Sequence, residues 1–252
     1  MIDNAQAPSA PFAPSSVASR SPAWSRVDAD PLVAPAAAGS ASAELAARYE
    51  NLYQTASGDP SCLPWHRPGM NRPLTRWLNT NAPCLVRPGA RTVVVGCGLG
   101  DDVIELANRG FDACGFDISP TCIDWARRRF PDHADRFFVA DVLDTPTRLR
   151  ARFGLVVEAY TIQSVWPSVR DHAFAGVVSL AKPHGVVLVL TRSSEDGTTL
   201  DDCECAPYPI CPSELHERME RFGLSPAHPP IDCTNDRDPP EPSLLAAFHR
   251  EP

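Results

Sequence analysis

Glycines and acidic residues recur where predicted strands end, and together they have the chemistry of a nucleotide-like cofactor site. Three alternating glycines follow a run of three valines, and glycine lets backbone approach a ligand lying over the end of a strand. An acid about twenty residues further on is placed to hold ribose hydroxyls. Two more acids end later strands. The set comprises Gly96, Gly98, Gly100, Asp117, Asp141 and Glu158.

The spacing of the glycines discriminates between cofactors. A nicotinamide dinucleotide site prefers Gly-x-Gly-x-x-Gly, which seats a pyrophosphate on the start of a helix. Here the spacing is Gly-x-Gly-x-Gly, and Asp101 and Asp102 occupy the predicted helix start. Two carboxylates would repel a pyrophosphate but suit a ligand that carries an ammonium group and no phosphate. The pattern therefore favours S-adenosylmethionine over a nicotinamide cofactor.

From residue 91 onward, predicted strands and helices alternate, which is typical of a parallel sheet with crossover helices. Short apolar runs predict the strands and helical periodicity predicts the helices. We therefore expect a Rossmann-like, doubly wound α/β sheet of seven strands, mostly parallel with an antiparallel C-terminal strand, and with helices on both faces. Expected strands are 91–95, 111–116, 136–140, 155–158, 185–190, one near 231 and 244–249; expected helices are 101–108, 120–130, 168–181 and 212–222.

The N-terminal part divides into an arm and a region that covers the sheet. Residues 1–42 are dominated by Ala, Pro and Ser and are predicted to be a disordered arm, so the domain is placed at 43–252. Residues 43–90 are predicted to be a lid region, with a helix near 42–53, a loop at 63–70 and a helix at 73–78. Its aromatic residues either close a pocket or cover one face of the sheet.

Composition narrows the partners and the compartment. The formal net charge of −8 gives no electrostatic footprint for nucleic acid or an anionic membrane. No apolar run reaches the roughly 18 residues that span a bilayer, and the N-terminus lacks a secretory signal pattern. Nine cysteines are an odd number, and Cys97, Cys114 and Cys122 fall in predicted buried elements. We expect free thiols, a cytoplasmic location and a small-molecule partner; the oligomeric state is not indicated.

The region from about residue 44 onward resembles the class I S-adenosylmethionine-dependent methyltransferases. Three segments carry the resemblance: Val95–Gly100, Gly115–Ser119 and Ala140–Leu143. Two shorter stretches, Tyr49–Tyr53 and Leu63–His66, resemble the thiopurine and thiol/halide methyltransferase branch. One position departs from the family, which usually has an aspartate at the start of the fourth strand where this chain has Gly154. We expect this glycine to loosen the strand start without abolishing cofactor binding.

The resemblance implies roles for individual residues. The glycines would approach the methionine part of the cofactor, Asp117 would hold both ribose hydroxyls, and Asp141 would face the adenine amine beside the backbone amide of Val142. Glu158 and Tyr160 would lie near the transferable methyl group, and Trp65 would close over the site. The implied catalytic set is Glu158, Tyr160 and Trp65; the implied cofactor set is Gly96, Cys97, Gly98, Gly100, Asp101, Asp117, Ile118, Asp141, Val142 and Glu158.

Simpler interpretations stand beside these roles. Asp117 could be a surface turn acid and Asp141 a helix cap, while Tyr160 and Gln163 could be ordinary packing. Glu158 at a buried strand end needs a polar partner. Four later cysteines invite a zinc interpretation, but their spacing matches no common zinc module and no metal is expected. They are Cys203, Cys205, Cys211 and Cys233.

The acceptor is constrained by what is missing from the fourth strand. Methyl transfer from a sulfonium mainly requires alignment of nucleophile, methyl group and leaving sulfur. No Lys or His stands at the end of this strand, and the sequence reads Glu-Ala-Tyr-Thr from Glu158 instead of the Asn/Asp-Pro-Pro-Tyr pattern of nucleic-acid amino methylation. A thiol or other soft nucleophile needs least help. The sequence predicts a small-molecule methyltransferase of this kind; O- or N-methylation and a non-catalytic cofactor-binding protein are the alternatives.

Overall fold

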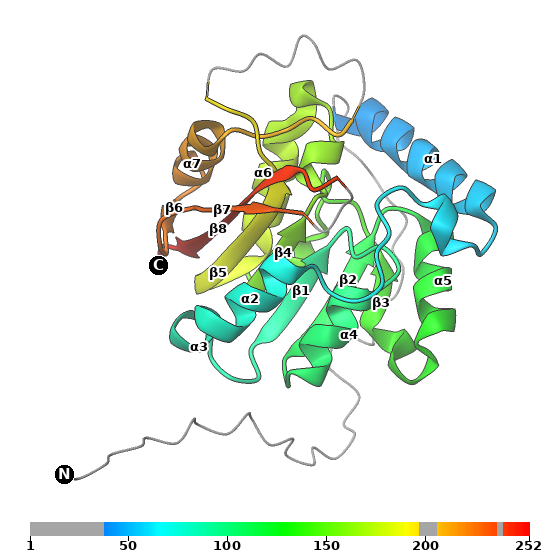
Figure 1. Ribbon diagram of the computed structural model, residues 1–252, viewed down its shortest axis with the longest axis horizontal. Coiled ribbons are helices and arrows are strands. Elements are labelled where there is room, and N and C mark those ends of the chain that lie inside the picture. The colour runs from blue at the N-terminus through cyan, green and yellow to red at the C-terminus, as the bar shows by residue number, and fades with distance from the viewer. Residues whose placement is uncertain (1–37, 197–205, 236–238) are drawn as a thin grey trace.

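A computed structural model describes residues 38–196, 206–235 and 239–252, and a mixed sheet forms its centre (Figure 1). The sheet has eight strands in the order β3-β2-β1-β4-β5-β8-β6, and β7 pairs with β8. Strands β1 to β5 are mutually parallel, whereas β8 runs antiparallel to β5, β6 and β7. The strands are β1 Arg91–Val95, β2 Asp112–Asp117, β3 Phe137–Val139, β4 Phe153–Ala159, β5 Ala181–Arg192, β6 Leu224–Pro226, β7 Ile231–Thr234 and β8 Pro242–Arg250.

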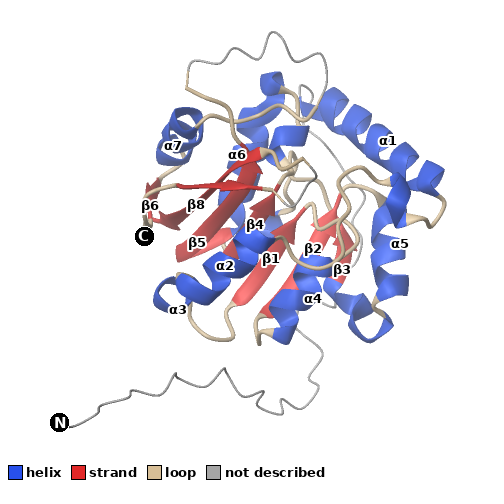
Figure 2. Cartoon of the chain, viewed as in Figure 1, coloured by secondary structure: helices blue, strands red, loops and turns tan. Residues whose placement is uncertain are grey.

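Helices cover both faces of this sheet (Figure 2). The side chains of β1 alternate between the two faces: Val93 and Val95 belong to one hydrophobic core and Val94 to the other. Both faces of the sheet are therefore apolar and need a cover. The first core is completed by α6 and α7, the second by α2, α3, α4 and α5. The helices are α1 Ala38–Ala56, α2 Arg72–Thr80, α3 Ala82–Leu85, α4 Asp101–Asn108, α5 Pro120–Arg129, α6 Arg170–Leu180 and α7 Pro212–Arg221.

The predicted fold class is confirmed, with differences at the ends of the chain. The structure adds the strand β6, which has three residues and ends in Pro226, so it carries no strand pattern of its own. Helix α1 begins at Ala38, inside the stretch predicted as a disordered arm. The rest of that arm lies outside the described residues, as do Cys203 and Cys205, two of the four later cysteines.

Gly154 lies at an irregularity in β4. The pairing between β4 and β5 shifts register between Phe153 and Leu155, on either side of this glycine. A Cβ built on Gly154 would lie 3.3 Å from the Cβ of Ala90, a close but not forbidden contact. The start of the strand is therefore irregular where the family departure was noted, while the pairing is regular from Leu155 to the carboxyl end that faces the site.

Candidate functional site

A cavity of about 530 Å³ opens at the carboxyl ends of the parallel strands, and residues of α1 line one side of it. Its wall contains residues from β1, β2 and β4, from the turns that follow them, and from the N-terminal region. Of the predicted site residues, Gly100 and Glu158 do not line the cavity. The others do: Trp65, Gly96, Cys97, Gly98, Asp101, Asp117, Ile118, Asp141, Val142 and Tyr160.

The glycines after β1 differ in what surrounds them. Gly96 and Gly98 both have positive φ angles, 59° and 52°, which favour glycine. A Cβ on Gly96 would lie 2.2 Å from the Oγ1 of Thr161, so this glycine admits Thr161. Gly98 leaves open space, since a Cβ built on it would have the Tyr53 hydroxyl as its nearest neighbour, at 3.7 Å. Gly98 is thus the glycine whose backbone leaves room for a ligand in the cavity.

Gly100 serves packing on the other side of the turn. It has a φ of 93° and precedes the first residue of α4. A Cβ there would lie 2.7 Å from the ring of Phe137. The third glycine of the motif therefore lets α4 start close to β3, and the structure does not place it against the cavity.

Asp117 joins the ends of β1 and β2. Its Oδ2 accepts a hydrogen bond from the Gly98 amide at 3.2 Å, and its Oδ1 accepts one from the Ser119 amide at 3.1 Å. The residue is only 8% exposed, and burial raises the pKa of its carboxyl. This placement does not match a solvated turn acid. Helix α5 begins directly after this acid and is capped by Ser119, whose Oγ accepts from the Cys122 amide.

Asp141 also faces the cavity and closes a local turn. Its Oδ1 accepts from the Leu143 amide at 2.7 Å, and its Oδ2 accepts from the hydroxyl of Ser42 on α1. No helix starts at this residue, since the next helical turn begins at Thr147. The helix-cap interpretation of Asp141 is therefore wrong. Ser42 carried no motif that marked it in the sequence.

The two aspartates at the start of α4 are in unlike surroundings. Asp101 forms an ion pair with Arg129, at 2.6 Å, and accepts from the Gly69 amide. Asp102 also lines the cavity, accepts a backbone hydrogen bond from Asn71, and its buried Oδ1 has no hydrogen-bond partner among the described residues. Burial raises the pKa of Asp102 to about 7. Asp102, which was not among the predicted site residues, is the one with unused acceptor capacity.

Glu158 is completely buried and supports the turn after β4. Its Oε1 accepts from the backbone amides of Thr161 and Ile162, at 2.6 and 2.9 Å, while Oε2 has no partner among the described residues. Burial raises the pKa of this carboxyl to about 7. The polar partner expected for this acid is thus the backbone of its own turn, which positions Tyr160 at the cavity.

A pH-dependent stability follows from Glu158. Its carboxyl holds a proton up to about pH 7 when folded but ionises near 4.5 when unfolded, so rising pH across this window favours unfolding. Glu158→Gln should therefore be more stable than the parent at pH 8, on the order of 2 kcal/mol, and gain much less at pH 5. Urea unfolding at both values measures this. The exposed Glu217→Gln is the control, and an equal gain at both pH values contradicts the expectation.

Tyr160 is held in an unusual backbone conformation at the cavity wall. Its φ is 62°, a left-handed value that is costly for a non-glycine residue. The Tyr160 amide donates to the Leu190 carbonyl at 2.7 Å, and its phenol oxygen lies 3.4 Å from the Ser243 hydroxyl. Contacts to both β5 and β8 thus hold the tyrosine in place. Such outliers cluster at functional sites.

Some N-terminal aromatic residues line the cavity and others cover the sheet. Trp65 packs edge-on against the rings of Tyr49 and Tyr53 at 5.8 Å, and all three line the cavity. In contrast, Trp77 of α2 is buried in the core against the sheet. Helix α1 is fixed over the cavity by Glu50, whose carboxylate accepts from the hydroxyls of Ser119 and Thr121. Helix α1 and the Trp65 loop therefore cover the cavity, and α2 covers the sheet.

The polar residues on the β5 side of the cavity were not predicted from the sequence as site residues. Gln163, Arg192 and Asn235 line it, although none belongs to a recognisable motif. Arg192 is the last residue of β5 and Asn235 follows β7, so the sheet topology brings them together. Their shared position at the cavity follows from the strand order, which sequence patterns do not specify.

Comparison with known proteins identifies the central part of the chain. Residues 93–185, from β1 into β5, match the family model described as "Methyltransferase domain". This segment is therefore similar to methyltransferase domains. The domain match includes the predicted site residues from Gly96 to Tyr160 and stops before Arg192.

Two of the similar proteins are methyltransferases named for the molecule that they methylate. The 2-heptyl-1-hydroxyquinolin-4(1H)-one methyltransferase of Mycobacteroides abscessus is 27% identical over 138 residues, which are 52% of this chain and 60% of that protein. A Burkholderia thailandensis 1,6-didemethyltoxoflavin-N1-methyltransferase, solved with its substrate and S-adenosylhomocysteine, is similar with a TM-score of 0.62 at 18% identity, covering 90% of this chain and 94% of that one. The chain thus spans less than two thirds of the curated relative, and the structural likeness shows the fold.

A third similar protein is a solved structure whose description concerns sulfur chemistry. The structure described for the conversion of a disulfide bond into a thioacetal group during echinomycin biosynthesis has a TM-score of 0.63 and 18% identity. It covers 82% of this chain and 93% of that one. Its similarity again concerns the methyltransferase fold.

Cys97, Cys114 and Cys122 are buried free thiols, as expected from their places in the sequence. Within the described ranges, no group of three or more His, Cys, Asp or Glu side chains is arranged to hold a metal ion. No helix in those ranges is long and apolar enough to cross a membrane.

Proposed function

We propose that the chain is an S-adenosylmethionine-dependent methyltransferase that acts on a small molecule, with residues 43–252 as the functional domain. The observation that carries the proposal is the cavity in which Asp117 bonds the Gly98 amide, with Asp102 and Asp141 on the same wall. The matched methyltransferase domain and the bound S-adenosylhomocysteine of the toxoflavin relative support it.

The residues of the cavity fit the chemical groups of this cofactor. Asp117 offers a carboxylate to ribose hydroxyls. Asp141 offers a carboxylate to an adenine amine, which would replace the Ser42 hydroxyl as the donor to its Oδ2. The unpartnered Oδ1 of Asp102 suits the ammonium group of the methionine part, because Asp101 is already neutralised by Arg129. Gly98 leaves the space that a close approach requires.

The chain contributes alignment and exclusion of water. S-adenosylmethionine supplies an electrophilic methyl group on its sulfonium sulfur when bound. Tyr160, fixed by β5 and β8, forms the wall next to β4, and Glu158 holds that turn. Trp65 and Tyr49 cover the cavity from the lid side, which excludes water and favours an in-line arrangement of the acceptor.

A thiol or other soft heteroatom is the acceptor that this site best suits. Among the described residues, the carboxylate at the end of β4, Glu158, is buried behind the cavity wall and does not line the cavity. A nucleophile that ionises near neutral pH needs no general base. The sulfur chemistry of the echinomycin relative and the branch resemblance of residues 49–53 and 63–66 support this choice. Free thiols suit a cytoplasmic enzyme.

O- or N-methylation is the second candidate, and His66 favours it. His66 lines the cavity, and burial lowers its pKa, so the imidazole is neutral at pH 7 and can accept a proton. The hydroxyquinolone and toxoflavin relatives, named for such acceptors, also support it. His66→Gln would abolish transfer to a phenol or amine and leave transfer to a thiol.

Calorimetry with S-adenosylhomocysteine tests the proposal directly. Micromolar binding is the expected result, followed by label transfer from the methyl-labelled cofactor to a thiol in a screen of thiols, phenols and amines. Absence of binding overturns the proposed function. Tight binding with no transfer to any member of the screen would instead support a non-catalytic cofactor-binding protein.

A further inference from the structure

Arg192 presents unused hydrogen-bond donors to the cavity. Its Nη2 donates to the Glu241 carboxylate at 2.5 Å, and no partner is found for Nε or Nη1 within the described ranges. The side chain is about one quarter exposed and lines the cavity. An arginine that is anchored at one nitrogen and has other N–H donors open can hold a second oxygen group through charge-assisted hydrogen bonds.

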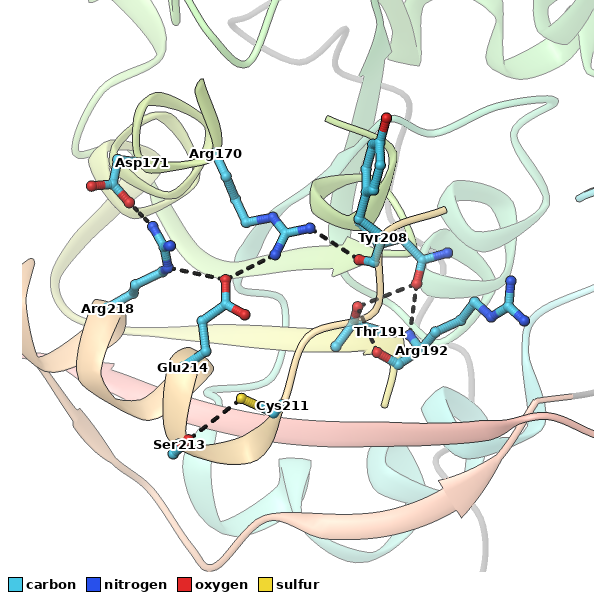
Figure 3. Close-up of polar contacts among 10 residues, drawn as sticks. Arg170, Asp171, Thr191, Arg192, Tyr208, Cys211, Ser213, Glu214 and Arg218 are labelled. Atoms are coloured by element: carbon cyan, nitrogen blue, oxygen red, sulfur yellow. Dashed lines mark hydrogen bonds and ion pairs between the residues drawn. The ribbon is translucent and has the colours of Figure 1, made fainter. Parts of the chain in front are cut away.

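The backbone of Arg192 is fixed by a network of polar contacts (Figure 3). Its amide donates to Gln163 Oε1 at 2.6 Å, and its carbonyl accepts from the Ile210 amide at 3.0 Å. The Gln163 carbonyl in turn accepts from the Tyr208 amide at 2.7 Å. These bonds hold the end of β5 against the segment 206–210, whose Ala206 and Pro207 also line the cavity.

A buried ion pair secures the outer side of that segment. The guanidinium of Arg170 is fully buried, donates to the Tyr208 carbonyl at 3.0 Å and pairs with Glu214 of α7 at 2.8 Å (Figure 3). Placing a charge at zero exposure is costly unless it is paired and hydrogen-bonded. The network thus gives Arg192 and its neighbours a defined position, which surface arginines lack.

The acidic and the basic residues of the cavity lie at the ends of different strands. Asp117 and Asp141 lie at the ends of β2 and β3, and Asp102 follows β1. Arg192 lies at the end of β5, beyond β4, on the side away from these acids. Because the acids are assigned to the cofactor, the β5 side is left for the acceptor.

Other cationic residues of the cavity are less suited to this role. Arg48 and Arg67 belong to the lid region and are exposed, and Arg67 donates to the neighbouring His66 carbonyl. Long exposed side chains lose entropy when they are fixed on a ligand. Glu241, which pairs with Arg192, has its second oxygen occupied by the Asn235 amide at 2.7 Å, so it does not compete for the open edge of the guanidinium.

We infer that Arg192 is an acceptor-binding residue and that the methyl acceptor is a flat aromatic molecule bearing a carboxylate or an equivalent oxyanion. The aromatic walls are Tyr49, Trp65 and Tyr160, and Arg192 donates to the oxyanion from the guanidinium N–H groups that Glu241 leaves open. This inference rests on the proposed function, because it takes the acid side of the cavity as the cofactor site.

The test uses the full chain loaded with S-adenosylhomocysteine and two probes that differ in one group. By calorimetry, 2-naphthoate should bind about tenfold or more tightly than neutral 2-naphthalenemethanol, the scale of a hydrogen bond to a charged group. Arg192→Gln should remove this preference and leave the affinity for S-adenosylhomocysteine unchanged. Equal affinity of the two probes, or no measurable binding of 2-naphthoate, overturns the inference.

Two further variants separate ligand binding from structural support. Glu241→Gln removes the ion pair but keeps Arg192, so the preference for 2-naphthoate should persist or increase; its loss would show that Arg192 acts only by holding the fold. Arg48→Gln, an exposed arginine on the same cavity, should leave the preference intact. Failure of S-adenosylhomocysteine itself to bind would overturn the proposed function, whereas binding without a carboxylate preference would overturn this inference alone.

Discussion

Replacing Asp117 with alanine should weaken S-adenosylhomocysteine binding by at least about tenfold, the scale of losing a charged hydrogen-bond acceptor. In the structure this carboxylate bonds the amides of Gly98 and Ser119 and is nearly buried. The change would therefore remove an acceptor for ribose and also leave two backbone donors unpaired. Calorimetry gives the affinity, and urea unfolding gives the cost to the fold.

Two companion variants distinguish these contributions. Asp117→Asn keeps one carbonyl acceptor and should lose less affinity than the alanine variant. Asp112, at the opposite end of β2, is paired with Arg91 at the partly exposed start of the sheet. Asp112→Ala should leave the affinity unchanged. An Asp117→Ala protein that is folded and binds with parental affinity would remove this residue from the cofactor site.

Much of the fold is predictable because its signals are local. The valines of β1, the glycines after it and the cap at Ser119 each specify a structure within a few residues. The missed strand β6 exists only because β8 offers a free edge to Leu224–Pro226. Likewise, helix α1 starts at Ala38 in an Ala- and Ser-rich stretch, where Ser42 finds its partner on distant Asp141. Both differences between the predicted and the observed fold involve contacts with residues far away in the sequence.

The residues of the candidate site also differ in whether local sequence patterns could predict them. The acids assigned to the cofactor follow strands directly, so strand prediction was sufficient to bring Asp117 and Asp141 to one edge. Which of Asp101 and Asp102 remains free depended on Arg129, a residue on another helix. Arg192 and Asn235 required the order in which β5, β8 and β7 pair. Side-chain pairing across elements is the information that the sequence pattern lacked.

Replacing Gly176 with alanine should destabilise the protein by on the order of 3 kcal/mol or more and also weaken cofactor binding. In a helix such as α6, glycine to alanine normally stabilises by about 0.5–1 kcal/mol. Here the added Cβ would lie 1.8 Å from the carbonyl oxygen of Val142 and 2.9 Å from Thr145 Oγ1. Because the nearest atom is backbone, relief requires α6 or the turn after β3 to move, and the clash outweighs helix propensity.

The displaced turn would carry Asp141 and Val142 with it, so stability and S-adenosylhomocysteine affinity should fall together. Urea unfolding and calorimetry on the same protein measure the two effects. Gly154→Ala is the matched control, since its nearest contact is the Ala90 side chain at 3.3 Å and its φ is not left-handed; it should change both quantities little. A Gly176→Ala protein as stable as the parent would mean that the close packing of α6 on this turn does not hold the cofactor side of the cavity in place.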